Sequence, residues 1–258
     1  MHDTKYTIFF AVAVCFVCSI FVAGSAVLLK DRQEANALLD QQKKVLSVAD
    51  LLEEGEKLSP AEVNALFEKN IQSVVVNLAT GAVASDIDAT AFDQKKAAMD
   101  TATSEAAPEN GAKVRRIPHH GLVYRVVVDD ELTAIIFPIE GAGLWGTLYG
   151  YIAIAPDLKT VKGITFYKHK ETPGLGGEVD NPRWKNLWVG RQAFDDRGRV
   201  ALSVKKGQAG SVEEDPYQVD GLSGATLTSR GVTHTLEFWL GDQGFGPYIT
   251  AARNGGSM

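Results

Sequence analysis

The residues from Asp220 to Thr228 combine small and hydroxyl-bearing side chains in the order DGLSGATLT. They lead into a run, Thr228 to Leu240, whose apolar residues repeat at helical spacing. The first turn of a helix carries unpaired N–H groups at the positive end of the helix dipole, so this stretch could bind an anion such as a phosphate. A turn closed by a serine or threonine N-cap explains the same residues without a ligand.

A second cluster, Lys168 to Gly177, follows a predicted strand and reads KHKETPGLGG. Proline and glycine allow an ordered loop that approaches a flat ligand closely, and Leu175 could cover one face of a ring. The basic residues Lys168, His169 and Lys170 suit a phosphate, or a ring that gains negative charge on reduction. A solvated basic hairpin tip without a ligand is the alternative interpretation.

The third cluster, Gly141 to Gly150, reads GAGLWGTLYG and places aromatic residues between glycines. Such a segment could form a stacking wall, and a glycine hairpin with core aromatics explains it equally well. None of the three clusters pairs a nucleophile with a base, assembles a metal-ligand set, or contains G-x-G-x-x-G opening a helix after a strand. We therefore expect no catalytic acid or base in this chain, and NADH to bind elsewhere.

These clusters must be positioned by the rest of the chain, which begins with an apolar segment. Residues 6–29 form 24 consecutive positions without a charge, enough at about 1.5 Å per residue to cross the ~30 Å hydrocarbon core of a bilayer. A cleavable signal peptide is the alternative, because Ala23 and Ser25 are small, but its apolar core is usually only ~7 to 15 residues long. Cys15 and Cys18 both lie in this segment, so the rest of the chain has no cysteine for a disulfide.

Cys15 and Cys18 share one face of the predicted helix. We interpret them as packing residues, because two thiolates would serve as metal ligands only with further ligands from a partner.

The charges around the apolar segment bear on its orientation in the membrane. Only Lys5 precedes it whereas Lys30 and Arg32 follow it, and the positive-inside rule would place the bulk of the chain in the cytoplasm.

Apolar residues at helical spacing predict a helix over residues 34–57. A second helix, ending near Ile71, is predicted by Ser59 as its cap, Pro60 at its first position and Glu62 three residues after the cap. A strand is expected at residues 74–78. Residues 95–113 have few large apolar side chains, so we expect a surface helix or a mobile connection without a chemical role. Further strands are predicted at residues 122–128, 132–139, 148–155, 161–166 and 200–204, and a helix at residues 228–240 with Val232, Leu236, Trp239 and Leu240 on one face.

This pattern predicts an α+β fold in which a single N-terminal transmembrane helix precedes a soluble domain with an antiparallel sheet and flanking helices. We divide the chain into an anchor (1–33), a membrane-proximal helical or α+β region (34–120) and a ligand-binding domain (121–258). Composition supports a folded protein, with 45% hydrophobic and 22% charged residues. The net charge of -6 argues against nucleic acid as a partner.

Taken together, the clusters resemble a known family. The Ser-Gly-Ala-Thr sequence ending at Thr226, the His169-x-Glu-Thr-Pro-Gly-Leu-Gly sequence upstream and the glycine-rich Leu-Trp-Gly segment around Trp145 are similar to the covalent FMN-binding C subunits of sodium-translocating NADH:quinone reductases. The likeness extends over nearly the whole chain and includes the apolar N-terminal segment and the stretch from Asn77 to Gly81.

The resemblance implies that FMN is esterified through its phosphate to Thr226. In this family a flavin transferase that uses FAD and a divalent metal makes the ester, and the stretch beginning at Asp220 is similar to its recognition signal, which comprises Asp220, Gly221, Ser223, Gly224, Ala225 and Thr226. Ser223, Gly224 and Ala225 would give access to the hydroxyl, and the backbone of Leu227 and Thr228 would hold the phosphate. The ring contacts implied are Glu171, Thr172, Gly174, Leu175 and Gly176 on one side and Trp145, Gly146 and Thr147 on the other.

A covalent tether is physically sensible for a half-exposed flavin, because such a cofactor has too little buried contact area to stay bound. FMN performs the redox chemistry while the protein sets its orientation and access, which agrees with the lack of a catalytic acid or base. The resemblance further implies a periplasmic domain anchored in the bacterial inner membrane and a six-subunit complex that relays electrons from NADH towards quinone and exports sodium. The periplasmic expectation follows the resemblance and conflicts with the charges around the anchor.

Two other interpretations remain open at this stage. The G subunit of the related ferredoxin:NAD electron-transport complex shares the flavin motif and the anchor, although the long region between the anchor and Gly121 favours the sodium pump. A membrane-tethered binding module without a redox role would use the glycine clusters as turns, and Thr226 would only cap a helix.

Overall fold

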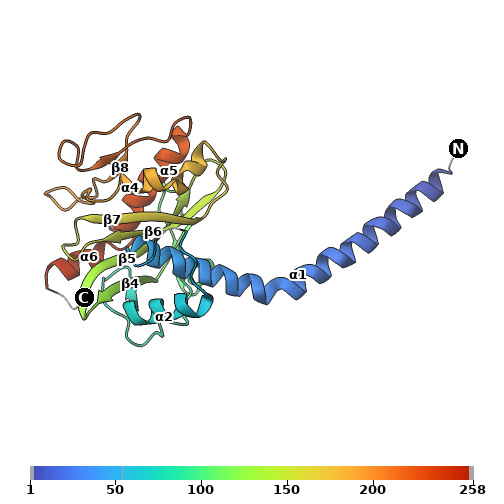
Figure 1. Cartoon of the computed structure of the whole chain (residues 1–258), viewed down its shortest axis with the longest axis horizontal. Helices are drawn as coiled ribbons and strands as arrows, with labels where there is room; N and C mark the ends of the chain where they lie inside the picture. The colour runs from blue at the N-terminus through green and yellow to red at the C-terminus, as the bar shows by residue number, and fades with distance from the viewer. Residues whose placement is uncertain (1–2, 54, 256–258) are drawn as a thin grey trace. The chain divides into compact units, whose positions relative to one another are not determined.

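The structure is a computed structural model that describes residues 3–53 and 55–255 (Figure 1). The helices are α1 (Thr4–Val48), α2 (Pro60–Asn70), α3 (Gln94–Met99), α4 (Pro182–Asn186), α5 (Thr226–Leu240) and α6 (Gly246–Arg253), with a 3-10 turn η1 (Gly176–Asp180). The strands are β1 (Ile71–Asn77), β2 (Ser104–Ala106), β3 (Arg116–Pro118), β4 (His120–Val128), β5 (Glu131–Ala142), β6 (Thr147–Ile154), β7 (Val161–Lys168), β8 (Ser203–Val204) and β9 (Gln218–Val219). The chain forms two compact units, one up to Gln41 and one from Gln42 onward.

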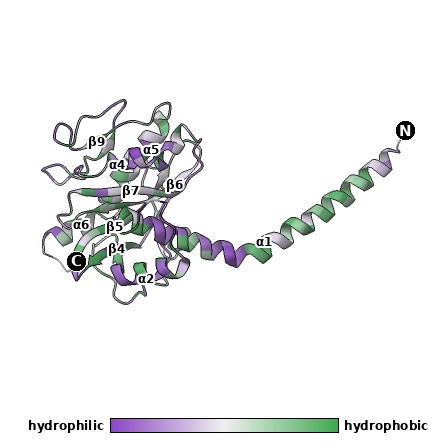
Figure 2. Cartoon of the chain, viewed as in Figure 1, coloured by the Kyte–Doolittle hydropathy of each residue, from purple (hydrophilic) through white to green (hydrophobic). Residues whose placement is uncertain are grey.

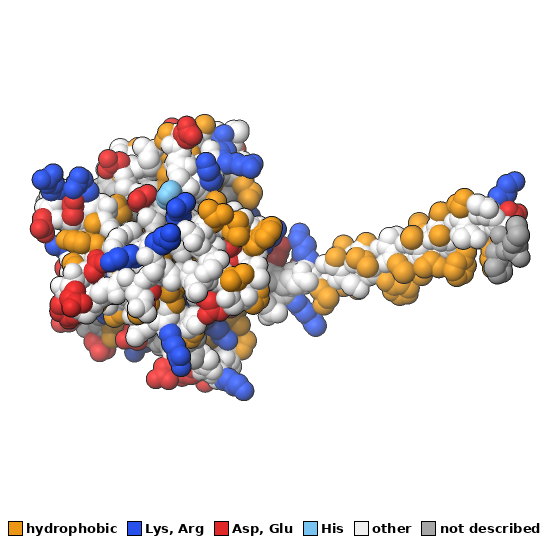
Figure 3. Space-filling view, turned by 90° about the horizontal axis from the view of Figure 1, so that it is seen from above, with side chains coloured by type: hydrophobic (Ala, Val, Ile, Leu, Met, Phe, Trp, Pro, Cys, Tyr) orange, Lys and Arg blue, Asp and Glu red, His pale blue; other side chains and the backbone are white. Residues whose placement is uncertain are grey.

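The described part of the first unit consists almost wholly of the N-terminal part of α1, up to Gln41, and this helix is long and apolar enough to cross a membrane. Figure 2 shows an apolar N-terminal part followed by a polar part within the same helix, and Figure 3 shows hydrophobic side chains along the apolar part. Cys15 and Cys18 are both exposed on it. The predicted membrane helix is therefore present among the described residues.

The helix that we predicted over residues 34–57 is wrong in its bounds, because α1 continues through this region and ends at Val48. Asp50 adopts the left-handed conformation, with φ of 62°, and the Leu51 N–H donates to the carbonyl of Leu46 at 2.9 Å. This is the pattern by which a left-handed residue ends a helix. The final turn of α1 belongs to the second unit, where Val45, Leu46 and Val48 are buried.

The predicted start of α2 is confirmed by its capping interactions. The Ser59 hydroxyl accepts from the Glu62 N–H at 3.4 Å, the Glu62 carboxylate accepts from the Ser59 N–H at 2.8 Å, and Pro60 occupies the first turn. These reciprocal bonds satisfy donors that a helix start otherwise leaves unpaired. The Ser59 hydroxyl also donates to the Glu62 carboxylate at 2.7 Å, and this bond, followed by that from the Ser59 N–H, lowers the pKa of Glu62.

A five-stranded antiparallel sheet in the order β1-β4-β5-β6-β7 forms the centre of the second unit. The predicted α+β class is confirmed. Strand β1 lies before Gly121 in the chain yet pairs along its whole length with β4. The three-part domain division stays a prediction, and this pairing places residues from both sides of its second boundary in one sheet.

Helix α5 packs tightly against β5. A Cβ atom on Gly231 would lie 2.1 Å from the carbonyl oxygen of Ala142, and one on Gly141 would lie 1.9 Å from the Thr235 hydroxyl. The predicted apolar face is confirmed, because Val232, Leu236, Trp239 and Leu240 are all buried in the core. This contact fixes the start of α5 next to the turn that leaves β5.

Two other sequence predictions need correction. The strand expected over residues 200–204 is reduced to β8, which pairs in parallel with β9 and lies outside the main sheet. For residues 95–113, the surface helix that was one of the two expectations is present as α3, but it is followed by the unpredicted strand β2, which pairs with β3. The short helix α4 and the C-terminal helix α6 were not predicted.

Candidate functional site

Thr226 is the first residue of α5, and its side chain is exposed. The preceding turn brings it there, because Gly224 adopts a φ of +69° and the Ala225 N–H donates to the Leu222 carbonyl at 3.1 Å. The Ser229 hydroxyl accepts from the Leu222 N–H at 3.1 Å and ties this turn to the helix. The threonine hydroxyl is thus presented at a rigid helix start.

The N–H groups of Thr226, Leu227 and Thr228 have no hydrogen-bond acceptor among the described residues, and the first helical bond runs from the Ser229 N–H to the Ala225 carbonyl at 3.0 Å. The residue before the helix, Ala225, has no side-chain oxygen that could cap these donors. An uncapped helix start of this length attracts an anion through both its free donors and its dipole. The interpretation of Thr226 as a mere N-cap is not supported, since Thr226 lies inside the helix and no side chain caps it.

A cavity of about 500 Å³ lies beside Thr226 and is lined from two directions. One wall is the stretch from Asp220 to Gly224 together with Thr226, Ser229 and Arg230, and the other is the loop from Val204 to Gln208. Arg230 follows Thr226 by four positions, which places both on one helix face. Lys205, Lys206 and Arg230 bring three cations to this cavity, which Thr226 and Asp220 also line, and Lys205 pairs with Asp215 at 3.2 Å.

The loop that carries Lys205 and Lys206 is held by the residues around it. The Asp220 carboxylate accepts from the Ala209 N–H at 2.8 Å, and the Gly221 N–H donates to the Gly207 carbonyl at 2.7 Å. The buried Arg191 donates to four carbonyls, including those of Gly210 at 2.9 Å and Ser211 at 3.0 Å. Asp220 therefore has a positional role in the folded protein: it joins the two walls of the cavity.

Glu171 joins the three predicted clusters through a buried carboxylate. One oxygen accepts from the Thr228 hydroxyl at 2.5 Å, and the other accepts from the Trp145 N–H at 2.9 Å. Gly176 packs so closely that an added Cβ would lie 2.4 Å from the Glu171 carboxylate. Glu171 thus joins these loops beneath the site, and its predicted contact with the flavin ring stays a prediction.

The basic residues of the second cluster have separate partners. The His169 Nδ1 accepts from the Glu171 N–H at 3.1 Å, and its Nε2 contacts the Asp180 carboxylate at 2.7 Å. The Lys170 side chain lies along Gly146, where a Cβ would come within 3.2 Å of it. His169 therefore orients the loop.

Large apolar side chains surround this helix start and remain exposed. Leu175 lies over the turn at Gly224, where an added Cβ would come within 2.8 Å of its methyl group. Leu144, Trp145, Leu175 and Leu227 are 47%, 65%, 44% and 55% exposed. Scattered exposed leucines are ordinary, but four large apolar side chains around one anion-attracting helix start indicate a surface for a flat apolar group.

Comparison with known proteins assigns this geometry to a family. A family model described as an FMN-binding domain matches residues 143–241, a segment that contains the Leu144–Thr147 turn, the Glu171 loop and the start of α5. The C subunit of the Na(+)-translocating NADH-quinone reductase of Pseudomonas aeruginosa is 47% identical over 257 residues, covering 98% of each chain. The chain belongs to this family of reductase C subunits. The Vibrio anguillarum member is 46% identical and covers 98% of this chain and 96% of its own.

Solved structures of the family have the same fold. The crystal structure of Shewanella oneidensis NqrC has a TM-score of 0.76 at 37% identity and covers 83% of this chain and 97% of its own. The C subunit from Parabacteroides distasonis has a TM-score of 0.66 at 29% identity and covers 86% and 97%. The predicted family resemblance is thereby confirmed.

Within this family fold, most of the predicted contact residues lie near the start of α5. Exposed members are Thr147, Thr172, Gly174, Leu175, Ser223, Gly224, Thr226 and Leu227, and buried or partly buried ones are Gly146, Glu171, Gly176, Ala225 and Thr228. Their roles as cofactor contacts stay a prediction. Among the described residues, no group of three or more metal-ligating side chains includes Cys15 or Cys18.

Sequence reasoning missed Lys205, Lys206 and Arg230. Two signals for them were available: a basic pair directly before Gly207, and an arginine four positions after Thr226 in a predicted helix. The loop from Val204 to Gln208 is distant from Thr226 in sequence, and only the folded chain brings it to the cavity. Arg191 was missed as well, because nothing local marks a buried arginine that binds carbonyls.

Proposed function

We propose that this chain is the membrane-anchored FMN-carrying subunit of a sodium-translocating NADH:quinone reductase, with FMN attached through a phosphoester to Thr226. The observation that carries the proposal is the exposed Thr226 hydroxyl at an uncapped helix start, inside a cavity with three cations. Bound FMN supplies reversible electron uptake, relaying electrons from NADH oxidation towards quinone. The NADH and quinone sites belong to other subunits.

The residues around Thr226 fit a phosphate linked to a flat apolar ring. Free N–H groups of Thr226, Leu227 and Thr228 face the position of an anion, and Lys205, Lys206 and Arg230 offset its charge. The exposed side chains of Trp145 and Leu175 supply apolar surface beside it. This combination supports FMN as the cofactor over a ligand without a phosphate.

Each part of the site has a physical task in this proposal. The Gly224 turn presents the Thr226 hydroxyl to the flavin transferase, for which the stretch from Asp220 to Thr226 serves as the recognition signal. Glu171 keeps the Trp145 turn and the start of α5 in one arrangement. The loop containing Lys205 holds positive charge at the phosphate. None of these tasks requires a proton transfer.

Helix α1 anchors the chain in the bacterial inner membrane, and the domain from Gln42 onward faces the periplasm. The helix length and its exposed apolar surface support anchoring. The periplasmic side follows from family membership and goes against the charges at Lys5, Lys30 and Arg32. The partners are the other members of a six-subunit complex that couples electron transfer to sodium export.

The proposal is tested by following the flavin through denaturation. Wild type, Thr226→Val and Thr250→Val are expressed in a host with an active flavin transferase, denatured, and analysed by intact mass and by gel fluorescence. Thr250 is an exposed threonine in α6 and controls for the exchange itself. We expect wild type and Thr250→Val to be fluorescent and heavier by FMN minus water, and Thr226→Val to have its bare mass.

A wild-type chain at its bare mass beside a proven transferase would overturn the covalent proposal. Retention of the full mass increase by Thr226→Val would place the ester on another residue.

The orientation of the domain is tested separately with a cysteine introduced at Lys69, an exposed position in α2, and a thiol reagent that does not cross the membrane. Labelling of intact spheroplasts is expected, and labelling only after lysis would place the domain in the cytoplasm.

A further inference from the structure

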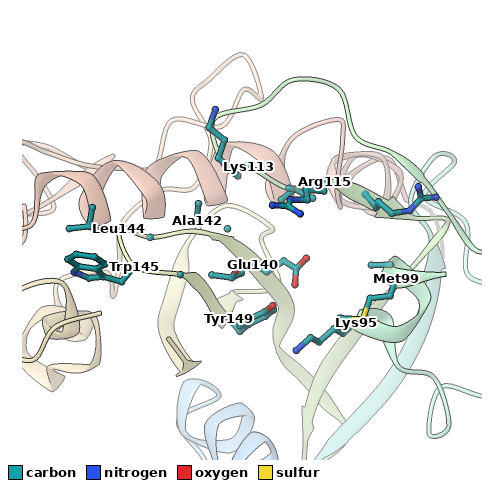
Figure 4. A pocket seen from close by; sticks show the side chains of 17 residues that line it. Lys95, Met99, Lys113, Arg115, Glu140, Ala142, Leu144, Trp145 and Tyr149 are labelled. Atoms are coloured by element: carbon teal, nitrogen blue, oxygen red, sulfur yellow. The ribbon is translucent and has the colours of Figure 1, made fainter. Parts of the chain in front are cut away.

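A second and larger cavity, of about 790 Å³, opens on the other side of the Trp145 turn (Figure 4). Its walls come from α3, from the segment before β3 and from the ends of β5 and β6 with the turn between them. The exposed side chains of Met99, Leu144 and Trp145 lie at its edge and are 68%, 47% and 65% exposed. The function proposed above shares Trp145, Gly146 and Thr147 with this cavity but gives no role to its charged residues.

Four cations line this cavity against one carboxylate. They are Lys95, Lys113, Arg115 and Arg116, and the carboxylate is that of Glu140. Figure 4 shows Glu140 pointing into the cavity, with the side chains of Lys95 and Arg115 on either side of it in this view. Burial raises the pKa of Glu140, and nearby Lys95 opposes this shift.

The four cations differ in the interaction partners that they already have. Arg116 donates to the Ser104 hydroxyl at 2.8 Å and to the Ser104 carbonyl at 2.6 Å, and Lys95 lies 4.5 Å from the centre of the Tyr149 ring. No described carboxylate pairs with Lys113 or Arg115, and both side chains are exposed. This concentration of positive charge is unusual in a chain whose net charge is -6.

We propose that this cavity docks a carboxylate-rich segment of another subunit of the same complex. Arginine, tryptophan and methionine at the edge of a charged hollow are the residue types that protein interfaces favour, which distinguishes the site from one built for a small anion. The unpaired Lys113 and Arg115 match an acidic segment, while Met99 and Trp145 supply apolar contact. The inference rests on the proposed function in taking the partner from the reductase complex.

Docking here would bring the partner next to the cofactor site. Trp145 contributes to the edge of this cavity, and its N–H is held by Glu171, which also binds Thr228 two residues after the proposed attachment point. Electrostatic steering of the two partners favours electron exchange, because steered encounters are fast and need little buried area. The cavity therefore serves as the place where an electron-exchanging subunit meets this domain.

The test compares two double charge reversals in the complete membrane complex. Lys113→Glu with Arg115→Glu alters the cavity, and Lys162→Glu with Arg183→Glu is the matched control, because these two exposed cations lie outside it. The complex is purified through a tag on another subunit at about 50 and 300 mM salt, and retention of this chain and its covalent flavin are measured separately. We expect the cavity variant to lose about tenfold in retention or in the rate of flavin reduction, with unchanged flavin content and a weaker salt dependence.

A photo-crosslinking residue at Met99 identifies the occupant. Crosslinking to an acidic segment of another subunit is expected, and changing acidic residues of that segment to lysine is expected to restore retention of the cavity variant. Equal behaviour of the two double variants at both salt concentrations, or a crosslink to lipid or to a second copy of this chain, would overturn the proposal. A wild-type chain without flavin would refute the proposed function and leave the retention result intact.

Discussion

Glu171 illustrates at the scale of one residue how the site is organised. The residue is 6% exposed, and its carboxylate accepts one hydrogen bond from the Thr228 hydroxyl and another from the Trp145 N–H. Burying a carboxylate is unfavourable unless its oxygens are satisfied, so the two partners and the carboxylate stabilise one another only as a set. A polar loop residue thereby behaves as part of the core.

Replacing this carboxylate with an amide provides a direct test. In Glu171→Gln only one of the two donors keeps a good acceptor, because the amide NH₂ must face a donor, and we expect a loss of about 2 kcal/mol in the free energy of unfolding. Urea unfolding of the full chain in detergent measures it. Glu237→Gln, an exposed change in α5, is the control and should stay within about 0.5 kcal/mol of wild type. Equal midpoints for the two variants would show that the Glu171 bonds contribute no net stability.

At the scale of elements, the decisive contact is that of α5 with the end of β5. Gly231 allows the helix to lie against the Ala142 carbonyl, and this contact sets the distance between the Trp145 turn and Thr226. The Ala142 carbonyl belongs to the backbone, so it cannot move away from an added side chain as the end of a flexible side chain could. The close approach of these two elements, more than any single bond, places the predicted clusters together.

Gly231→Ala is therefore expected to destabilise the domain although alanine is the better helix former. The helix preference favours alanine by about 1 kcal/mol, whereas forcing a methyl group into a backbone contact costs typically ~1 to 3 kcal/mol plus the displacement of α5. We expect a net loss of about 1 to 2 kcal/mol, measured by chemical denaturation. Glu237→Ala on the exposed face of α5 is the control and should stay within about 0.5 kcal/mol of wild type, and a stabilised Gly231→Ala variant would contradict the close packing.

Sequence patterns predicted these elements well where a local signal existed. The capping residues at Ser59 and Glu62 marked the start of α2, and helical spacing identified the buried face of α5. Nothing local indicated that α1 would continue to Val48, because the left-handed Asp50 that ends it is an ordinary polar residue in sequence. The cavity walls from Lys205 and Lys113 depend on long-range packing, and for that reason the sequence alone did not reveal them.

At the scale of the whole molecule, the chain has two units, and their boundary at Gln41 lies inside a single helix. The last turn of α1 completes the core of the second unit. Val45, Leu46 and Val48 are 1%, 0% and 6% exposed, and Val48 packs against the backbone of Gly163 in β7. The end of α1 is therefore part of the core of the second unit.

Two truncations separate the role of this last turn from that of the anchor. A chain of residues 42–258 keeps the buried turn, whereas a chain of residues 50–258 loses the buried Ala49 and the three larger buried side chains of Val45, Leu46 and Val48, which are worth about 1.5 kcal/mol or more each. We expect the longer chain to be soluble and cooperatively folded, and the shorter one to unfold about 10 °C lower. Calorimetry on both chains measures the difference. Coincident unfolding temperatures would show that the end of α1 is dispensable for the domain.

The exposed position of Thr226 has a consequence for the order of biosynthesis. Its surroundings, which include the left-handed Gly224, the free N–H groups and the distant loop containing Lys205, exist only once the sheet and α5 have assembled. Under the proposed function, a transferase that recognises this arrangement acts only on the folded domain, so an apoprotein accumulates first as a stable precursor. Flavin attachment would then select for folded protein, because a misfolded chain would not be modified with FMN.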